Sequence, residues 1–156
     1  MAISMPRLIP DLTSCPLTAA LEIMGERWSF LILRGAFHGL RHFEEFQGTL
    51  GIARNILSNR LTKLVESGIM SRHPHPEDRR KISYELTDKG QALLPVLVAL
   101  WQWGEKWEAD RPSDLVLVDR KDGRPVGTIA MRAHDGREVG VRELKWVERV
   151  KLAEAA

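Results

Sequence analysis

The sequence contains a single cysteine, Cys15, among its 156 residues. One thiol cannot form an internal disulfide or supply a cysteine-rich zinc site. The histidines do not compensate, because neither His38 with His42 nor His73 with His75 has carboxylates or thiols at a familiar ligand spacing. We therefore expect no bound metal and no cofactor.

Long apolar runs are also missing. No run approaches the length needed to span a bilayer, and Pro6 and Pro10 interrupt the N-terminal segment in a way that a secretory signal would not tolerate. The hydrophobic content of 44% and charged content of 28% are ordinary for a globular protein. We expect one cytoplasmic domain with a small appendage and no membrane partner.

Motifs of the common enzyme classes are absent as well. The chain has no glycine-rich phosphate loop, no nucleophile elbow around a serine and no metalloprotease helix motif. It also has no internal repeat or low-complexity stretch. These absences favour a binding protein over an enzyme.

The net charge of +2 gives no reason by itself to expect a nucleic-acid partner. Its distribution is more informative. Residues 53–81 carry seven basic and three acidic side chains, a net +4, so the rest of the chain carries −2. Positive charge is concentrated in one segment, as a surface facing a phosphate backbone requires. The alternative is a solvated helix followed by an ordinary charged hairpin.

The same segment predicts a helix followed by a two-stranded ribbon. The apolar residues of the helix fall on one face, and they are Ile56, Leu57, Leu61, Leu64 and Val65. The opposite face carries Arg54, Asn55, Ser58, Asn59 and Thr62. Gly68 is expected to end the helix, and a turn over 74–80 joins extended runs over 69–73 and 81–86.

A polar helix face followed by a basic ribbon is typical of a recognition helix and wing. We expect the helix to contact base edges through Arg54, Asn55, Ser58 and Asn59 and to approach phosphate through Arg60 and Lys63. At the tip of the wing, the expected contacts with backbone or minor groove are Arg79, Arg80 and Lys81.

Shorter elements precede this segment. Residues 1–12 predict a loose arm before a winged domain over 13–110. Pro16 suits the first position of a helix that runs to Met24 and is capped by Cys15 or Ser14. The expected elements that follow are a helix ending at Gly39, a short helix over 41–47 and a turn over 49–52.

Thr87 is the expected N-cap of a long helix over 88–109, kinked at Pro95. Apolar positions at alternating spacings of four and three predict a seam that faces another helix. They are Leu93, Leu97, Leu100, Gly104 and Trp107, with Trp101 beside them. The seam could pack on its own domain. A small winged domain leaves little core for so many large side chains, which favours a homodimer interface.

Residues 113–156 differ in texture from the rest. Asp122-Gly123 and Asp135-Gly136 are hairpin turn signals. We predict a three-stranded antiparallel sheet over 115–118, 126–131 and 139–144, with a helical end after it. A segment this short should not fold alone, so it should pack on the winged domain or on a partner subunit.

Several motifs in the first two thirds of the chain recur, in order and spacing, in a known family. They are Cys15-Pro-Leu17, Gly25-Glu-Arg-Trp28, Leu31-Ile-Leu-Arg34, Arg41-His-Phe-Glu-Glu-Phe46, Leu57-Ser-Asn-Arg-Leu61, Tyr84-Glu-Leu-Thr87 with Gly90, and Trp103-Gly104. In these motifs the chain resembles the HxlR group of winged helix-turn-helix transcription regulators, which are relatives of the MarR class. It departs from related sequences at Ala53, where a serine often caps the recognition helix.

The resemblance implies an α+β fold, a winged helix-turn-helix with a long C-terminal dimerisation helix, to which this chain adds the small antiparallel β-rich extension over 113–156. It implies a bacterial homodimer that places its recognition helices in the major groove of an inverted-repeat operator in double-stranded DNA. We expect a repressor without catalytic activity.

Two other interpretations stay open. Some members of the family sense oxidants or electrophiles through a cysteine at this N-terminal location, and a helix N-terminus favours a thiolate, so Cys15 is a candidate redox sensor. A small-molecule effector could equally act through the C-terminal sheet or the tryptophan-rich seam. The other interpretation is a winged-helix adaptor that binds protein and not DNA.

Overall fold

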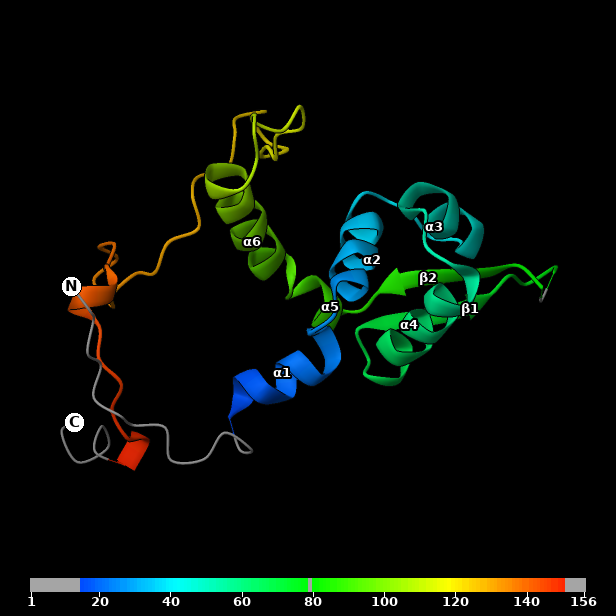
Figure 1. Cartoon of the computed structure of the whole chain (residues 1–156), viewed down its shortest axis with the longest axis horizontal. Helices are drawn as coiled ribbons and strands as arrows, with labels where there is room; N and C mark the ends of the chain where they lie inside the picture. The colour runs from blue at the N-terminus through cyan, green and yellow to red at the C-terminus, as the bar shows by residue number, and fades with distance from the viewer. Residues whose placement is uncertain (1–14, 79, 151–156) are drawn as a thin grey trace.

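The computed structural model describes residues 15–78 and 80–150. Its elements are α1 (Pro16–Met24), α2 (Arg27–Phe37), α3 (Phe43–Leu50), α4 (Arg54–Glu66), β1 (Met70–Pro74), β2 (Ile82–Leu86), α5 (Asp88–Gln91), α6 (Leu94–Trp107) and the 3-10 turn η1 (Val141–Glu143). Together they form the predicted winged helix (Figure 1). The predicted arm over 1–12, the alternative cap Ser14 and the end of the predicted C-terminal helix lie outside the described residues.

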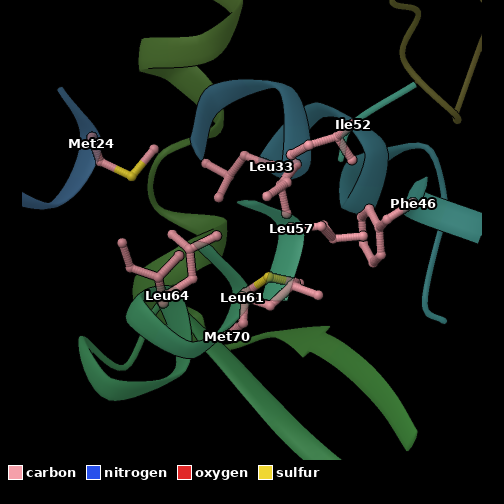
Figure 2. Close-up of a cluster of buried hydrophobic side chains, with 10 residues drawn as sticks. Met24, Leu33, Phe46, Ile52, Leu57, Leu61, Leu64 and Met70 are labelled. Carbon is pink, nitrogen blue, oxygen red and sulfur yellow. The ribbon is translucent and has the colours of Figure 1, made fainter. Parts of the chain in front are cut away.

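The core lies where α2, α3, α4 and the base of the wing meet, as Figure 2 shows. Helix α4 contributes Leu57, Leu61 and Leu64, each at most 1% exposed. Full burial of one leucine contributes roughly 1.5–3 kcal/mol, so this face holds α4 firmly on the domain. The prediction that Ile56 shares this buried face was wrong, because Ile56 lies beside the buried arc and is 37% exposed.

Two glycines turn the chain at the ends of the helix-turn-helix helices. Gly51 follows α3 with φ of 62°, and Gly68 follows α4 with φ of 73°. Side chains with a Cβ rarely adopt this left-handed conformation. The predicted helix end at Gly68 is thereby confirmed, and the open turn before Arg54 leaves the first turn of α4 at the surface.

The wing is an antiparallel pair in which Met70 lies opposite Leu86 and Pro74 opposite Ile82. A third segment pairs with the other edge of β2, because the N–H of Tyr84 donates to the carbonyl of Arg41 at 2.7 Å. The base of the wing is therefore tied to the residues just before α3.

The predicted long C-terminal helix is present with a break. Thr87 caps α5 through its Oγ1, which accepts a hydrogen bond from Gly90 N–H at 3.2 Å. The helix is then interrupted at Ala92 and Leu93 before α6 begins. Pro95 lies at the second position of α6. In a helix that continued unbroken from α5, its ring would press on the carbonyl of Gln91. The break thus falls just before the proline at which a kink was expected.

Helix α6 is apolar on two opposite faces. One face, formed by Leu94, Leu97, Val98 and Trp101, is turned toward α2 and the chain that follows α6. The other face is an exposed stripe of Val96, Leu100, Trp103 and Trp107, which are 49%, 50%, 53% and 64% exposed. The predicted seam mixed the two faces. Leu93 packs against the core, and Gly104 has no other atoms within 4 Å of a Cβ position.

The C-terminal extension, residues 113–150 of the described chain, is mostly extended. Both predicted turns are present, with φ of 70° at Gly123 and 85° at Gly136. They close two small hairpins whose strands are joined only by the isolated bridges Val118↔Pro125 and Arg132↔Glu138. The predicted three-stranded sheet does not form among the described residues, because the two hairpins do not pair with each other.

Candidate nucleic-acid interface

The outward face of α4 presents polar side chains that do not bond to their own domain. Asn55, Ser58, Asn59 and Lys63 are exposed, and among the described residues the amides of Asn55 and Asn59 have no hydrogen-bond partner. Thr62 is the exception, since its Oγ1 donates to the carbonyl of Ser58 at 2.9 Å. These amides can therefore bond to another molecule without breaking an internal contact.

Arg54 is the first residue of α4, and its guanidinium contacts an aromatic ring. Its guanidinium carbon lies 4.8 Å from the centre of the Phe43 ring on α3. This cation–π contact leaves the N–H groups of the guanidinium for outside acceptors. Ala53, at the N-cap, provides no side-chain hydrogen bond, so the first amides of α4 also remain open.

Arg60 does not join this group. Its side chain is 16% exposed and forms an ion pair with Glu26, which lies between α1 and α2. Its Nε is buried without a hydrogen-bond partner in the described part of the protein. Arg60 and Lys63 were both expected near phosphate. In the structure Lys63 is exposed, whereas Arg60 is turned toward its own domain.

The wing carries basic side chains away from the domain body. Arg80 and Lys81 are exposed, and the Nε of Arg80 lies 3.2 Å from the Oδ1 of Asp78. Arg79 lies outside the described residues. Arg72, which is exposed on β1, was not among the contacts predicted from the sequence. The signal for it was its position on a strand next to the basic tip.

A set of short-range contacts fixes α3 against the wing. The backbone N–H groups of Arg41 and His42 donate to the carboxylate of Glu45 at 2.8 and 2.9 Å. These two bonds lower the pKa of Glu45. Arg41 also pairs with Glu85 of β2 at 2.5 Å. The helix that precedes α4 is therefore anchored to the strand that carries the wing.

Cys15 lies at the N-cap of α1 and is partly exposed. The nearby backbone amides of Thr18 and Leu17 lower the pKa of its thiol. Within residues 15–78 and 80–150, no three metal-binding side chains come together as a metal site would require. No helix in this part of the chain is long and apolar enough to cross a bilayer.

A family model for an HxlR-like helix-turn-helix matches residues 23–112, which is more than half of the chain and includes α2 through α6 with the wing. The chain belongs to the HxlR family. Members of this family are transcriptional regulators and not enzymes, and DNA binding is implied by the helix-turn-helix. The family resemblance drawn from the sequence motifs is confirmed.

Two relatives illustrate how far the similarity reaches. An uncharacterised HTH-type transcriptional regulator of Mycobacterium tuberculosis is 47% identical over 88 residues, which cover 56% of this HxlR-family chain and 56% of the relative. The matched region thus spans little more than half of that relative's length. The HTH-type transcriptional regulator YodB of Bacillus subtilis is 32% identical over 111 residues, which cover 70% of this chain and 97% of YodB.

One solved structure resembles the chain beyond the family model. The crystal structure of PA1607, described as a candidate transcription factor, superposes with a TM-score of 0.81 at 45% identity, and the match covers 88% of this chain and 96% of PA1607. The family model ends at residue 112. The first 112 residues alone cannot account for that coverage, so the similarity continues into the extension.

Proposed function

We propose that the chain is a homodimeric, sequence-specific DNA-binding repressor that inserts α4 into the major groove. The observation that carries this proposal is the exposed face of α4. Asn55 and Asn59 lie one helical turn apart with unbonded amides, beside Arg54, whose guanidinium contacts the ring of Phe43. An asparagine amide matches the edge of adenine and a guanidinium matches guanine.

The exposed position of Ile56 adds an apolar contact to this surface. Ile56 stands on α4 next to the polar face and is 37% exposed. An aliphatic side chain at such a position suits the methyl group of thymine. Lys63, with Ser58 and the wing residues Arg80, Lys81 and Arg72, would contact phosphate or an adjacent minor groove. Arg79 belongs to these proposed phosphate contacts by its place in the sequence alone, and Arg60 does not belong to them.

The proposed dimer uses the exposed stripe of α6. Figure 1 shows α1 and α6 projecting from the domain on one side, with α3 and the wing on the other. A helix with apolar side chains on both faces needs cover on both. Leu17 and Leu21 of α1, 64% and 52% exposed, would extend the interface, with Leu100 and Trp103 of α6 near its middle.

The extension is proposed as a second part of this interface. Its apolar side chains are open to solvent, with Trp146 at 72% and Met131 at 57% exposure. A monomer rarely leaves so much apolar surface uncovered. We divide the chain into a winged domain over 13–110 and an extension over 113–156 that packs partly on the partner. Occupancy of an operator by this dimer would block polymerase, which is why we propose repression.

Fluorescence anisotropy with the DNA upstream of the protein's own gene tests the proposal. The wild-type chain should bind this duplex more tightly than a shuffled duplex of the same length. Asn55→Ala with Asn59→Ala should remove the preference and leave weak, salt-sensitive binding. Gln47→Ala is the control, because it removes an amide from the neighbouring helix α3 and should leave the preference unchanged. A protein that binds no duplex at low salt would instead be the adaptor considered above.

A specific observation also supports redox sensing as a second function. The thiol of Cys15 is partly exposed and has a lowered pKa. YodB, the relative described above, has been solved in a quinone-bound form that resembles this chain with a TM-score of 0.51 at 30% identity. We propose that an electrophile which alkylates Cys15 changes DNA affinity. The test compares wild type with Cys15→Ser before and after treatment, and equal responses would reject Cys15 as the sensor.

A further inference from the structure

A cavity of about 380 Å³ lies between α2, α6 and the start of the extension. Phe37 of α2 and Leu97 and Trp101 of α6 line it from the winged domain, and residues 115–117 form its roof. Small-molecule sites have volumes from roughly 300 Å³ upward and are lined mainly by apolar and aromatic side chains. This cavity meets both conditions.

Hydrogen bonds from α6 hold the roof in place. The carboxylate of Glu105 accepts from the backbone N–H of Ser113 at 2.6 Å. The amide of Gln102 donates to the carbonyl of Gly127 at 3.2 Å and accepts from the N–H of Ile129 at 2.8 Å. These bonds secure the chain on both sides of the roof, so the roof is a segment held on α6 and not a loose tail.

The charged lining of the cavity is basic. Arg34 reaches it from α2, and His38 lies one helical turn further on. In the described part of the chain, the side chain of Arg34 has no ion-pair or hydrogen-bond partner. Glu105, on the facing helix, is bonded to Ser113 and not to Arg34. The guanidinium of Arg34 is therefore available to an anion that enters the cavity.

The cavity is separate from the proposed dimer surface. Leu97 and Trp101 line it, whereas Leu100 and Trp103 belong to the exposed stripe. At 3.6 residues per turn Trp101 and Trp103 point to opposite sides of α6, and Leu97 and Leu100 lie next to each other where the two faces meet. A partner subunit that covers the stripe therefore leaves the cavity face of α6 to its own chain.

We propose that this cavity binds a small aromatic carboxylate. The ring would lie among Phe37, Leu97 and Trp101, where it gains apolar burial and ring contacts. The carboxylate would accept two parallel hydrogen bonds from Arg34, a geometry that a guanidinium favours. The roof begins beyond residue 112, where the family model ends, so this site depends on the extension. Binding at this site requires no DNA.

Isothermal titration of the full chain with 2-naphthoate, without DNA, tests the proposal. We expect one site per chain. Arg34→Met should weaken binding at least about fivefold, because it removes the charged partner and keeps the apolar stem. The neutral analogue 2-naphthalenemethanol should bind more weakly than 2-naphthoate and should not respond to Arg34→Met. Arg27→Met, which alters a guanidinium of the same helix that stacks on Trp28, should leave the affinity for 2-naphthoate unchanged.

A second variant tests the cavity itself. Leu97→Trp fills the space between α2 and the roof and should abolish binding of both compounds. Because Arg34 is exposed, Arg34→Met should keep the wild-type unfolding temperature, so its result holds even if Leu97→Trp destabilises the fold. The proposal is overturned if millimolar 2-naphthoate does not bind the wild-type chain. Equal affinity of wild type and Arg34→Met for 2-naphthoate would overturn it as well.

Discussion

Arg60 of α4 is ion-paired with Glu26 in the link between α1 and α2. The guanidinium side chain is 16% exposed, and its carboxylate partner is 51% exposed. The pair therefore bridges α4 to the N-terminal part of the domain, with the arginine mostly buried and the carboxylate half exposed. We expect Glu26→Gln to lower the free energy of unfolding by about 1–2 kcal/mol, since it leaves a buried guanidinium without its counter-charge.

Thermal unfolding of Glu26→Gln, Arg60→Met and the double variant measures this pair as a double-mutant cycle. The double variant should be more stable than the two single losses would predict by addition. DNA affinity should change little in any of the three. A large loss of DNA affinity confined to Arg60→Met would mean that Arg60 contacts DNA as the sequence first suggested.

Gly90 is required by its contact with Ile69, which lies between α4 and β1. A Cβ at this position would lie 2.2 Å from the carbonyl oxygen of Ile69. Backbone must move to admit it, so Gly90→Ala should destabilise the protein by about 2–4 kcal/mol. Gly48→Ala is the matched control, because a Cβ there has nothing within 4 Å and the residue lies inside α3. The control should be stabilised by roughly 0.5–1 kcal/mol in chemical denaturation.

Glu45 gives the fold an acid-sensitive contact. Its folded-state pKa is lowered by the backbone N–H groups of Arg41 and His42. A carboxyl with a lowered pKa contributes stability above its unfolded-state pKa, and the contribution disappears as pH falls through the folded-state value. Glu45→Gln should therefore be less stable than wild type near neutral pH, and the difference should shrink below about pH 4. Urea unfolding of both proteins near neutral pH and below about pH 4 checks this prediction. A stability difference that does not depend on pH would contradict it.

The wing prediction concerns salt as well as affinity. Arg80→Ala with Lys81→Ala should lower affinity for every duplex by a similar factor, because phosphate contacts carry no sequence information. The slope of log affinity against log salt should fall by about 1–2, one unit for each lost phosphate contact. Arg111→Ala with Lys121→Ala, which removes two cations outside the winged domain, is the control. An unchanged slope in the wing variant would show that these side chains do not reach the backbone.

The sequence predicted the winged domain well because its local signals agree. Three residues each mark an element boundary by their own backbone chemistry: Pro16 after Cys15, Gly68 after α4 and Thr87 before α5. The buried face of α4 was predicted apart from Ile56. That residue stands at the edge of the buried arc, where spacing alone does not decide between core and surface.

The faces of α6 and the orientation of Arg60 could not be predicted. Because α6 is apolar on opposite sides, several seams fit its sequence, and only the placement of α2 selects Leu97 and Trp101 for the inner face. Arg60 lies beside the buried face of α4, three residues after Leu57 and four before Leu64. It pairs with Glu26, which is distant in sequence. The three-stranded sheet predicted for the extension was wrong, because the strong turn signals at Gly123 and Gly136 specify two hairpins but not the pairing between them.

The most direct test of the central claim is the number of chains that bind one duplex. Sedimentation of the wild-type chain should show a dimer at micromolar concentration and two chains on an operator duplex. Leu100→Glu with Trp103→Glu should give a folded monomer with much weaker binding, whereas Lys121→Glu should behave as wild type. A wild-type chain that sediments as a monomer and binds duplex one to one, with no loss in the Leu100→Glu and Trp103→Glu variant, would contradict the account.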